Sequence, residues 1–501
     1  MKANLLIAID CSTTACKAVV WNERGYAVAT GRHSYGLSYV GSSWVEQNAP
    51  DWWVAACSAI VDAVTQVGAS HIAGIAITHQ RETFVCLDKE GMPLRPAITW
   101  MDMRATAEVD EFGNSDVHRI TGKPPNPTPA WYKLLWLKKH EPKIFSKIAH
   151  VVDVGGFLVN KLTGEWATSW SSADPLGLVD MQSFDYHDGL LQETGLSRDN
   201  FGRLLPPGTI VGGLTKAVAE HLGLPSGLPV VVGAGDGQSA GLGCNLTQPG
   251  RAYLNLGTGA VSGIFSSTYT HGKSYRTMGG AVPGTYILET FIGGGTQNIS
   301  WFIDKLTEKQ SLTKPGETHE QHLEVVATEI PIGAEGLLCL PYWSGAMTPY
   351  WDGNARGAFV GLSGVHSKAH IYRAILEGIA FEQRLLTSGV ESETGTHIEE
   401  VLVLGGGSRS SLWCQIIANV LGRPVKLVRE QECTALGAGI HAAAALGLHP
   451  DLLTAANNMS GIEKTYEPDI STYNFYSKIY PTYCSIYPGL RETFRLNAES
   501  K

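Results

Sequence analysis

The sequence predicts an α/β protein of two domains arranged around a cleft. At 501 residues, the chain exceeds the size at which a single hydrophobic core usually stops growing. Short apolar runs rich in Val, Ile and Leu alternate with longer helical patterns, which is typical of buried strands connected by helices. Two turns rich in hydroxyl groups and glycine, 12–14 and 257–259, follow such runs about half a chain apart. Turns of this kind can offer N–H groups and hydroxyls to one polyphosphate from opposite sides, which indicates a nucleotide-splitting enzyme.

The first predicted domain covers residues 1–247. Pro50 and Asp51 suit the first turn of a helix, which we expect over 49–67. Mixed helices and loops are expected over 103–225. The predicted strands are 5–9, 17–21, 26–30, 72–78 and 229–237, the last of which ends in glycine-rich residues.

The second predicted domain, 248–501, shows the same alternation of short apolar strands, glycine-rich turns and helices. A loop of three glycines, 293–295, precedes a helix that contains Trp301, and a second glycine triplet, 405–407, follows a strand. The last 20 residues are expected to form a weakly specified tail. The predicted strands are 252–256, 260–265 and 401–404, and the predicted helices are 410–421 and 435–446.

Composition narrows the class of protein. A hydrophobic content of 44% and a charged content of 17% are ordinary for a soluble globular chain. The net charge of −9, with no basic stripe, argues against nucleic-acid and anionic-membrane partners. The nine cysteines are scattered without a CxxC motif, so we expect reduced thiols. No signal peptide or membrane-spanning run is evident, which predicts a cytoplasmic protein.

The first turn contains candidate phosphate and metal ligands. Asp10 ends a buried strand just before Ser12, Thr13 and Thr14. A carboxylate there could hold Mg²⁺, usually through water, beside bound phosphates. The alternative is a strand-terminating Asp in an Asx-turn, and Lys17 has its own alternative as a solvated strand residue. The paired turn at 257–259 favours the functional interpretation of Asp10.

Asp236 is the candidate catalytic base. It lies between Gly235 and Gly237 at the end of an apolar strand, where a carboxylate could take a proton from an attacking hydroxyl. A turn aspartate between two glycines is the alternative.

The candidate substrate residues are Arg81, Glu82 and Trp100. Arg81 and Glu82 follow the strand 72–78 and could bind several hydroxyls of a small polyol, while the indole covers its carbon skeleton. A surface ion pair and a core tryptophan are the alternative. The glycine triplet 405–407 could admit an adenine ring or phosphate at a helix N-terminus, or could simply form a tight turn.

Taken together, these segments resemble the FGGY family of carbohydrate kinases over nearly the whole chain. The most specific segment is GAFVGLSGVHSKAHIYRAILE (357–377), which fits the C-terminal signature of the family. The resemblance implies two domains of the actin/hexokinase/Hsp70 type, which are ribonuclease H-like, and phosphorylation of a sugar or polyol hydroxyl with ATP and Mg²⁺. The other matching segments are residues 10–17, RPAITW (95–100), GAGDGQ (233–238), LGTG (256–259), GGGSRSSLW (405–413) and ECTALGAGI (432–440).

The resemblance also assigns roles residue by residue. Asp10 would be the carboxylate on the magnesium side, and Asp236 would be the base and a second metal-side group. Arg81, Glu82 and Trp100, which were selected above from the residues alone, would contact the substrate together with Asp236. The implied nucleotide contacts are Ser12, Thr13, Thr14, Lys17, Gly257, Thr258, Gly295, Thr296, Gly406 and Ser410.

The chain departs from the family pattern at three positions. Ser12 stands where glycine is usual, Ala130 stands where a hydroxyl residue or proline is usual, and Thr128 replaces the substrate tyrosine of glycerol kinases. HQRETF (79–84) and TPYWDGNARG (348–357) are similar to glycerol kinase, whereas GGGSRSSLW and PLRPAITW are more similar to xylulokinase. Because the tyrosine is missing, we expect xylulose to be converted to xylulose 5-phosphate.

Several alternatives stay open. Glycerol or another polyol or furanone is the second choice of substrate. A chaperone-like ATPase without kinase activity is a remote alternative, because a chaperone should carry an added peptide-binding domain. A homodimer is possible.

Overall fold

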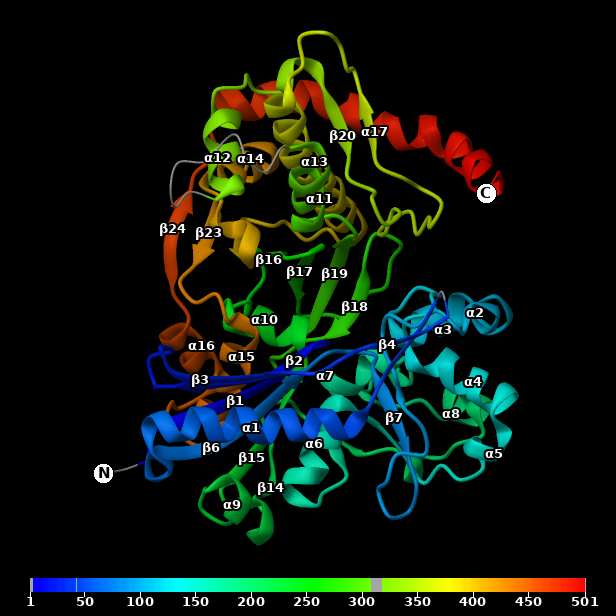
Figure 1. Ribbon diagram of the computed structural model, residues 1–501, viewed down its shortest axis with the longest axis vertical. Coiled ribbons are helices and arrows are strands. Elements are labelled where there is room, and N and C mark those ends of the chain that lie inside the picture. The colour runs from blue at the N-terminus through cyan, green and yellow to red at the C-terminus, as the bar shows by residue number, and fades with distance from the viewer. Residues whose placement is uncertain (1–2, 42, 308–317, 501) are drawn as a thin grey trace.

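The computed structural model describes residues 3–41, 43–307 and 318–500. It contains two large sheets, one in each half of the chain, with helices packed on their faces (Figure 1). The first sheet has the strand order β14-β15-β6-β1-β2-β3. Its strands are β1 (Leu5–Cys11), β2 (Ala15–Trp21), β3 (Ala27–Ser34), β6 (Ile72–His79), β14 (Ile210–Gly213) and β15 (Pro229–Gly235).

Three parallel strands of the first sheet end at the same edge. β1 pairs with β6, and β6 pairs with β15, both in parallel. The register places Asp10 opposite Thr78, and Gly235 opposite His79. Asp10 near the end of β1, Arg81 after β6 and Asp236 after β15 therefore meet at one edge of the sheet.

The second sheet has the strand order β18-β19-β17-β16-β22-β23-β24. β16 and β17 form an antiparallel hairpin around the second turn, and β22 lies parallel to β16. The strands are β16 (Arg251–Leu256), β17 (Ala260–Ser266), β18 (Arg276–Gly279), β19 (Tyr286–Ile292), β22 (Glu400–Leu404), β23 (Val425–Val428) and β24 (Ile462–Tyr466).

Helices cover both faces of the first sheet. α1 (Ala49–Val67) and α6 (Val154–Thr163) share a core with Ile7 and Ile9 of β1. The alternate residues Leu6 and Ala8 face α15 (Cys433–Ala445) and α16 (Leu452–Met459) instead. Two helices from the second predicted domain thus pack on the first sheet. The domain boundary after residue 247 stays a prediction.

The second sheet is covered on one face by the helices α11 (Thr296–Leu306), α12 (His319–Thr328), α13 (Lys368–Thr394), α14 (Ser411–Leu421) and α17 (Ile470–Glu499). On its other face lies α10 (Asp236–Gly243), whose Ala240 packs against Tyr253 and Leu402. Because α10 starts at Asp236 and ends against the second sheet, it connects the candidate base to the second half of the molecule.

A smaller sheet and short helices extend the first half toward β18 and β19. Ser171 Oγ donates to the carbonyl of Gly280 at 2.6 Å, and the Tyr286 hydroxyl donates to the carbonyl of Met181 at 2.9 Å. These contacts place β18 and β19 against the first half. This part contains the sheet β4 (Ser38–Val40), β5 (Trp44–Gln47), β8 (Ala97–Ile98), β7 (Phe84–Leu87) and β9 (His150–Asp153), with the short pairs β10 (Ala167–Ser169) with β13 (Arg203–Leu205) and β11 (Val179–Asp180) with β12 (Asp185–Tyr186). Its helices are α2 (Thr106–Phe112), α3 (Ser115–Thr121), α4 (Ala130–His140), α5 (Pro142–Phe145), α7 (Trp170–Ala173) and α8 (Asp188–Thr194), whereas α9 (Lys216–Leu222) shares the core of the first sheet.

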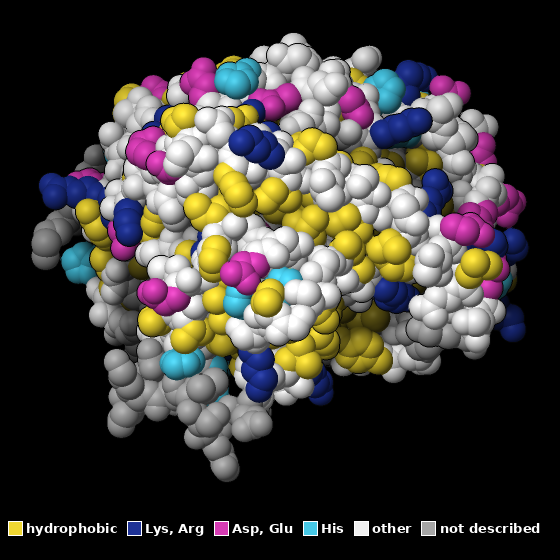
Figure 2. All heavy atoms as spheres, turned by 90° about the horizontal axis from the view of Figure 1, so that it is seen from above, with side chains coloured by type: hydrophobic (Ala, Val, Ile, Leu, Met, Phe, Trp, Pro, Cys, Tyr) yellow, Lys and Arg dark blue, Asp and Glu magenta, His cyan; other side chains and the backbone are white. Residues whose placement is uncertain are grey.

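Most predicted elements are confirmed, and one prediction is wrong. The helix over 49–67 and the strands around the two turns lie where they were expected. The expected weakly specified tail is instead part of α17, a helix of 30 residues. Pro481 and Pro488 interrupt its helical pattern, but apolar packing keeps the helix continuous. Apolar side chains also gather on the end of the molecule that α17 crosses (Figure 2).

The described residues contain no disulfide bond. All nine cysteines are free, and all but Cys484 are buried. Within the described ranges, no helix combines the length and the apolar character needed to cross a bilayer.

Candidate active site

Asp236 opens α10 directly after β15. One of its carboxylate oxygens, Oδ1, accepts from the N–H of Gly237 at 2.7 Å and from Nε of Arg81 at 2.8 Å. A Cβ at Gly235 would lie 2.5 Å from the Arg81 side chain, so glycine is required for this approach. The Asp236 side chain keeps 39% of its surface exposed, so the carboxylate can still reach a ligand.

Arg81 belongs to a chain of alternating charges that joins both halves of the molecule. Its Nη1 lies 2.6 Å from Oε2 of Glu289 on β19. The other oxygen of Glu289 binds Nη2 of Arg276 on β18 at 2.5 Å. Arg276 Nη1 then reaches Oε1 of Glu82 at 2.8 Å. The order is Asp236–Arg81–Glu289–Arg276–Glu82, with three carboxylates and two guanidinium groups.

Glu289 is the centre of this chain. Its side chain is 2% exposed. Burial alone would raise its pKa, but Arg276 and Arg81 outweigh burial and lower the pKa to about 2. Glu289 therefore stays ionised and holds both arginines in fixed positions.

Glu82 is held in an uncommon backbone conformation. Its φ of +58° lies in the left-handed region, which costs a non-glycine residue on the order of 1 kcal/mol. The side chain is nearly buried and turns toward Arg276. Arg81 and Glu82 do not form the surface ion pair with each other that was the alternative from the sequence. Each of them instead pairs with a residue of the second half, Arg81 with Glu289 and Glu82 with Arg276.

A cavity of about 250 Å³ adjoins the charge chain. It is smaller than the roughly 300–1,000 Å³ typical of pockets for drug-sized ligands, so it suits a small molecule. Tryptophans from both halves line it, Trp100 and Trp351. The full lining is Thr13, Arg81, Glu82, Trp100, Asn126, Thr128, Asp236, Val261, Arg276, Glu289, Phe291, Met347, Thr348 and Trp351.

The first turn touches this cavity through Thr13. Trp100 Nε1 donates to Thr13 Oγ1 at 3.0 Å, and Gln47 Nε2 donates to the Thr13 carbonyl at 2.5 Å. The Ser12 hydroxyl donates to the Ala15 carbonyl at 2.9 Å and closes the turn. Thr14 also lies in this turn and is exposed. The hydroxyl-rich turn thus lies between the cavity and β2.

Asp10 offers a carboxylate oxygen without a protein partner. Its Oδ1 is buried and makes no hydrogen bond to any described residue. Burial, followed by the charge of Asp236, raises the pKa of Asp10 to about 7, although Lys17 opposes this shift. Lys17 lies opposite Asp10 in the hairpin, and its Nζ binds Glu432 Oε2 at 2.6 Å. An orphaned carboxylate oxygen in this position fits a cation.

The second turn is braced by the residues that start α11. The hydroxyl and the N–H of Thr296 both donate to the Gly257 carbonyl, at 2.9 and 2.8 Å. A Cβ at Gly295 would lie 2.6 Å from that same carbonyl oxygen. Gly295 and Thr296 therefore support the turn that contains Gly257 and Thr258.

The second glycine triplet leads into α14. Ser410 is the N-cap of this helix, and its side chain accepts from the N–H of Trp413 at 3.1 Å. A Cβ at Gly406 would meet no atom within 4 Å, so this residue faces open space. Ser410 has a structural role of its own, and Gly406 leaves room for a ligand.

Comparison with family models decides the class of protein. The model of the N-terminal domain of the FGGY family of carbohydrate kinases matches residues 5–243, and the model of its C-terminal domain matches residues 252–446. The chain belongs to the FGGY family of carbohydrate kinases. These kinases use ATP as the phosphate donor.

Similar FGGY proteins are named for different substrates. The xylulose kinase of Bacillus subtilis is 28% identical, with 97% of each chain covered. The autoinducer-2 kinase of Klebsiella pneumoniae is also 28% identical, over 96% of this chain and 93% of that protein. The crystal structure of gluconate kinase from Lactobacillus acidophilus has a TM-score of 0.91 at 27% identity, covering 97% and 98% of the two chains. The fold is therefore that of FGGY kinases, and the sugar is not decided by similarity.

Sequence reasoning missed the part of the FGGY cavity that the second half supplies. Arg276 and Glu289 lie in strands, and Met347 and Trp351 lie in a loop far along the chain. Glu289 did leave a signal, since it is a single charge within the apolar run YILETFI (286–292). Trp351 lies in TPYWDGNARG, a segment that resemblance singled out without assigning it to the site.

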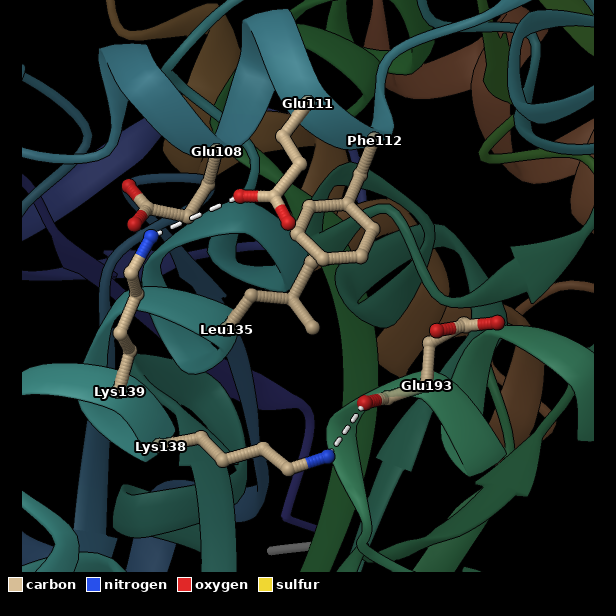
Figure 3. Close-up of a pocket in the computed structure, with 7 residues that line it drawn as sticks. All are labelled: Glu108, Glu111, Phe112, Leu135, Lys138, Lys139 and Glu193. Atoms are coloured by element: carbon tan, nitrogen blue, oxygen red, sulfur yellow. Dashed lines mark hydrogen bonds and ion pairs between the residues drawn. The ribbon is translucent and has the colours of Figure 1, made fainter.

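A second hollow, of about 310 Å³, lies among α2, α4 and α8 of the kinase (Figure 3). Lys139 Nζ lies 3.6 Å from Glu111 Oε2, and Lys138 Nζ donates to the backbone carbonyl of Glu193 at 2.8 Å. These contacts are drawn in Figure 3. None of the predicted site residues lines this hollow, whereas five of them, Thr13, Arg81, Glu82, Trp100 and Asp236, line the cavity at the strand ends.

Proposed function

We propose that this FGGY kinase transfers the γ-phosphate of ATP to a primary hydroxyl of a small uncharged ketose, most directly xylulose, giving xylulose 5-phosphate. The main support for this proposal is the chain of alternating charges beside the cavity. Among the described residues that line the cavity, Arg81 and Arg276 are the only cations, and each contacts two carboxylates. A sugar acid such as gluconate would need a cation that is not already neutralised, whereas hydroxyl groups can bind to an alternating chain of donors and acceptors.

Glycerol is the second candidate. HQRETF and TPYWDGNARG favour it, and both segments contribute cavity residues. Thr128 lines the cavity where glycerol kinases have a substrate tyrosine. Because the threonine side chain is smaller than that of tyrosine, it leaves room for a substrate with a longer carbon chain. This observation supports a ketopentose over glycerol. A furanone of similar size stays a further alternative.

Asp236 is the proposed base. The carboxylate accepts the proton of the substrate hydroxyl while that oxygen bonds to the γ-phosphorus and the bond to the β-phosphate oxygen breaks, releasing ADP. Arg81 fixes the orientation of the carboxylate through the 2.8 Å contact to Oδ1. Arg81 and Glu82 then bind substrate hydroxyls, and Trp100 covers the carbon skeleton.

The proposed nucleotide site is built from the two turns and the glycine triplet. The first turn lies next to the cavity, so the transferred phosphate would lie within reach of Thr13 and the substrate. Lys17 Nζ lies 2.6 Å from Glu432 Oε2, and we propose that it also contacts the bound nucleotide. The proposed nucleotide residues are Ser12, Thr13, Thr14, Lys17, Gly257, Thr258, Gly295, Thr296, Gly406 and Ser410.

Asp10 and Asp236 are the proposed residues on the metal side. A bound Mg²⁺ would neutralise charge on the phosphates during transfer. The orphaned Oδ1 of Asp10 supports this assignment. The described residues contain no cluster of three or more metal-ligating side chains, which suits an ion held mainly by phosphate, water and one or two carboxylates.

An ADP-release assay over a panel of neutral and acidic substrates tests the proposal. The panel is xylulose and other ketoses, glycerol, gluconate and an autoinducer-like furanone, each with saturating Mg-ATP. We expect the highest kcat/KM with a ketopentose and no stimulation by gluconate. A preference for gluconate would refute the charge argument. If no compound of the panel raised the rate of ADP release above the rate with ATP alone, the proposal that the protein phosphorylates a sugar or polyol would be refuted.

A further inference from the structure

The C-terminal helix contacts the far side of a loop that lines the substrate cavity. We call residues 346–352 the sugar-side loop. Met347, Thr348 and Trp351 of this loop line the cavity. Figure 1 shows α17 lying at the same end of the molecule as β20 (Leu338–Leu340), the strand that leads into the loop and pairs with β21 (Ala358–Val360).

The sugar-side loop is closed by its own end residues. The N–H of Ala346 donates to the Asp352 carbonyl at 3.0 Å, and the N–H of Asp352 donates to the Ala346 carbonyl at 2.9 Å. Between them, the N–H groups of Tyr350 and Trp351 both donate to the Met347 carbonyl at 2.8 Å. Trp351 has a φ of +48°, a conformation that surrounding contacts must maintain.

Asp352 connects this closed loop to α17. The hydroxyl of Tyr487 donates to Asp352 Oδ2 at 2.8 Å. The ring of Tyr487 also stacks on Tyr350, with 4.0 Å between centroids. Tyr487 is 5% exposed, and Asp352 is half-buried. One tyrosine thus holds the loop through both a hydrogen bond and an aromatic stack.

The helix that contains Tyr487 is anchored by a series of tyrosines along one face of α17. The tyrosines recur at intervals of three and four residues, which is the spacing of one helix face. Tyr483 donates to Glu382 Oε2 at 2.5 Å, and Tyr342 donates to the other oxygen of Glu382 at 2.9 Å. Tyr476 donates to Glu377 at 2.7 Å. The full series is Tyr473, Tyr476, Tyr480, Tyr483 and Tyr487.

We propose that Tyr487 is a positioning residue for substrate binding, which acts by holding the sugar-side loop against the cavity. This inference rests on the proposed function for the identity of the substrate. Tyr487 is not among the residues that line the cavity or among the proposed nucleotide residues. Its effect therefore passes through its contacts with Asp352, Tyr350 and Tyr342, whose ring lies edge-on to it with 5.8 Å between centroids. The C-terminal helix thereby determines the affinity for the sugar without contacting it.

Tyr487→Phe tests this inference because it removes the hydroxyl and keeps the ring on Tyr350. We expect KM for the sugar to rise by roughly three- to tenfold, the effect of losing one hydrogen bond, with KM for ATP unchanged. Amide hydrogen exchange should become faster in 346–352. Tyr473→Phe is the matched control, since Tyr473 lies on the same helix face but packs under Arg384. It should change neither quantity.

A double-mutant cycle with Asp352→Ala identifies the route of the effect. The double variant should be no worse than Asp352→Ala alone. An unchanged sugar KM in Tyr487→Phe, an equal rise in both KM values, or a similar change in Tyr473→Phe would overturn the inference. If the wild-type protein phosphorylates no substrate of the panel, the proposed function fails, and exchange in 346–352 alone then decides whether Tyr487 holds the loop.

Discussion

Nε of Arg81 lies 2.8 Å from Oδ1 of Asp236, although the two residues are far apart in the sequence. Arg81 follows β6 and Asp236 follows β15, and these strands are parallel neighbours in the first sheet. The same guanidinium also binds Glu289 of the second sheet. The proposed base is therefore oriented by a residue that both halves of the molecule hold in place.

Arg81→Ala should raise KM for the sugar far more than KM for ATP. The substitution removes a substrate donor and releases both Asp236 and Glu289, while the adenosine side of the cleft is unaffected. Steady-state kinetics with each substrate varied in turn measures the two constants. Arg32→Ala removes an exposed arginine whose Nη1 donates to Ser34 Oγ at 3.1 Å; it is the control and should leave both constants unchanged. A larger effect on ATP would mean that Arg81 lies on the nucleotide side.

Asp10→Asn should stabilise the protein at alkaline pH and yet slow the reaction. The folded-state pKa of Asp10 is raised from 3.8 to about 7. Its contribution to stability is therefore present below pH about 4 and is lost as the pH rises through 7, by an amount on the order of 4 kcal/mol. Asparagine lacks this loss, so the Tm of the variant should exceed that of the wild type at pH 8 and approach it near pH 4.

The activity of Asp10→Asn is the second half of this prediction. If Asp10 holds the metal through water, kcat with Mg-ATP should fall by roughly 10-fold or more. A variant that is both more stable and fully active would instead support the structural interpretation of Asp10 as a strand-terminating residue.

Glu382→Gln should flatten the pH dependence of stability between pH about 4.5 and 7. Burial raises the pKa of Glu382 to about 7, although the hydroxyls of Tyr483 and Tyr342 oppose the shift. The wild-type protein accordingly loses stability over that range as pH rises, whereas a neutral amide does not titrate. Thermal unfolding at a series of pH values checks this. The exposed Glu399→Gln should keep the wild-type profile, and a profile of Glu382→Gln that matches it would refute the prediction.

The first half of the site was predictable because its residues follow buried parallel strands. Asp10, Arg81 and Asp236 each come directly after a short apolar run, and parallel strands bring such positions to one edge. Trp100 was assigned to the substrate because it comes shortly after a proline-containing turn, and the structure places it after the short strand β8. Local patterns of apolar residues were sufficient for these assignments.

The second half of the site depends on contacts that local patterns do not contain. Arg276 and Glu289 reach the cavity because β18 and β19 pack against the first half through Ser171 and Tyr286. α17 was missed because Pro481 and Pro488 indicate a broken helix, whereas tertiary packing of its tyrosine face overrides that local preference.

The central claim is that Asp236 is the base of a phosphoryl transfer, and the kcat of Asp236→Asn tests it most directly. Asparagine keeps the shape of the side chain and can still accept from the N–H of Gly237 through its oxygen. It removes the charge and the basicity, so we predict that kcat falls by roughly 10²-fold or more while ATP binding and Tm are largely retained. A structural turn aspartate would show the opposite pattern. A kcat near that of the wild type, with a lowered Tm, would contradict the catalytic role of Asp236.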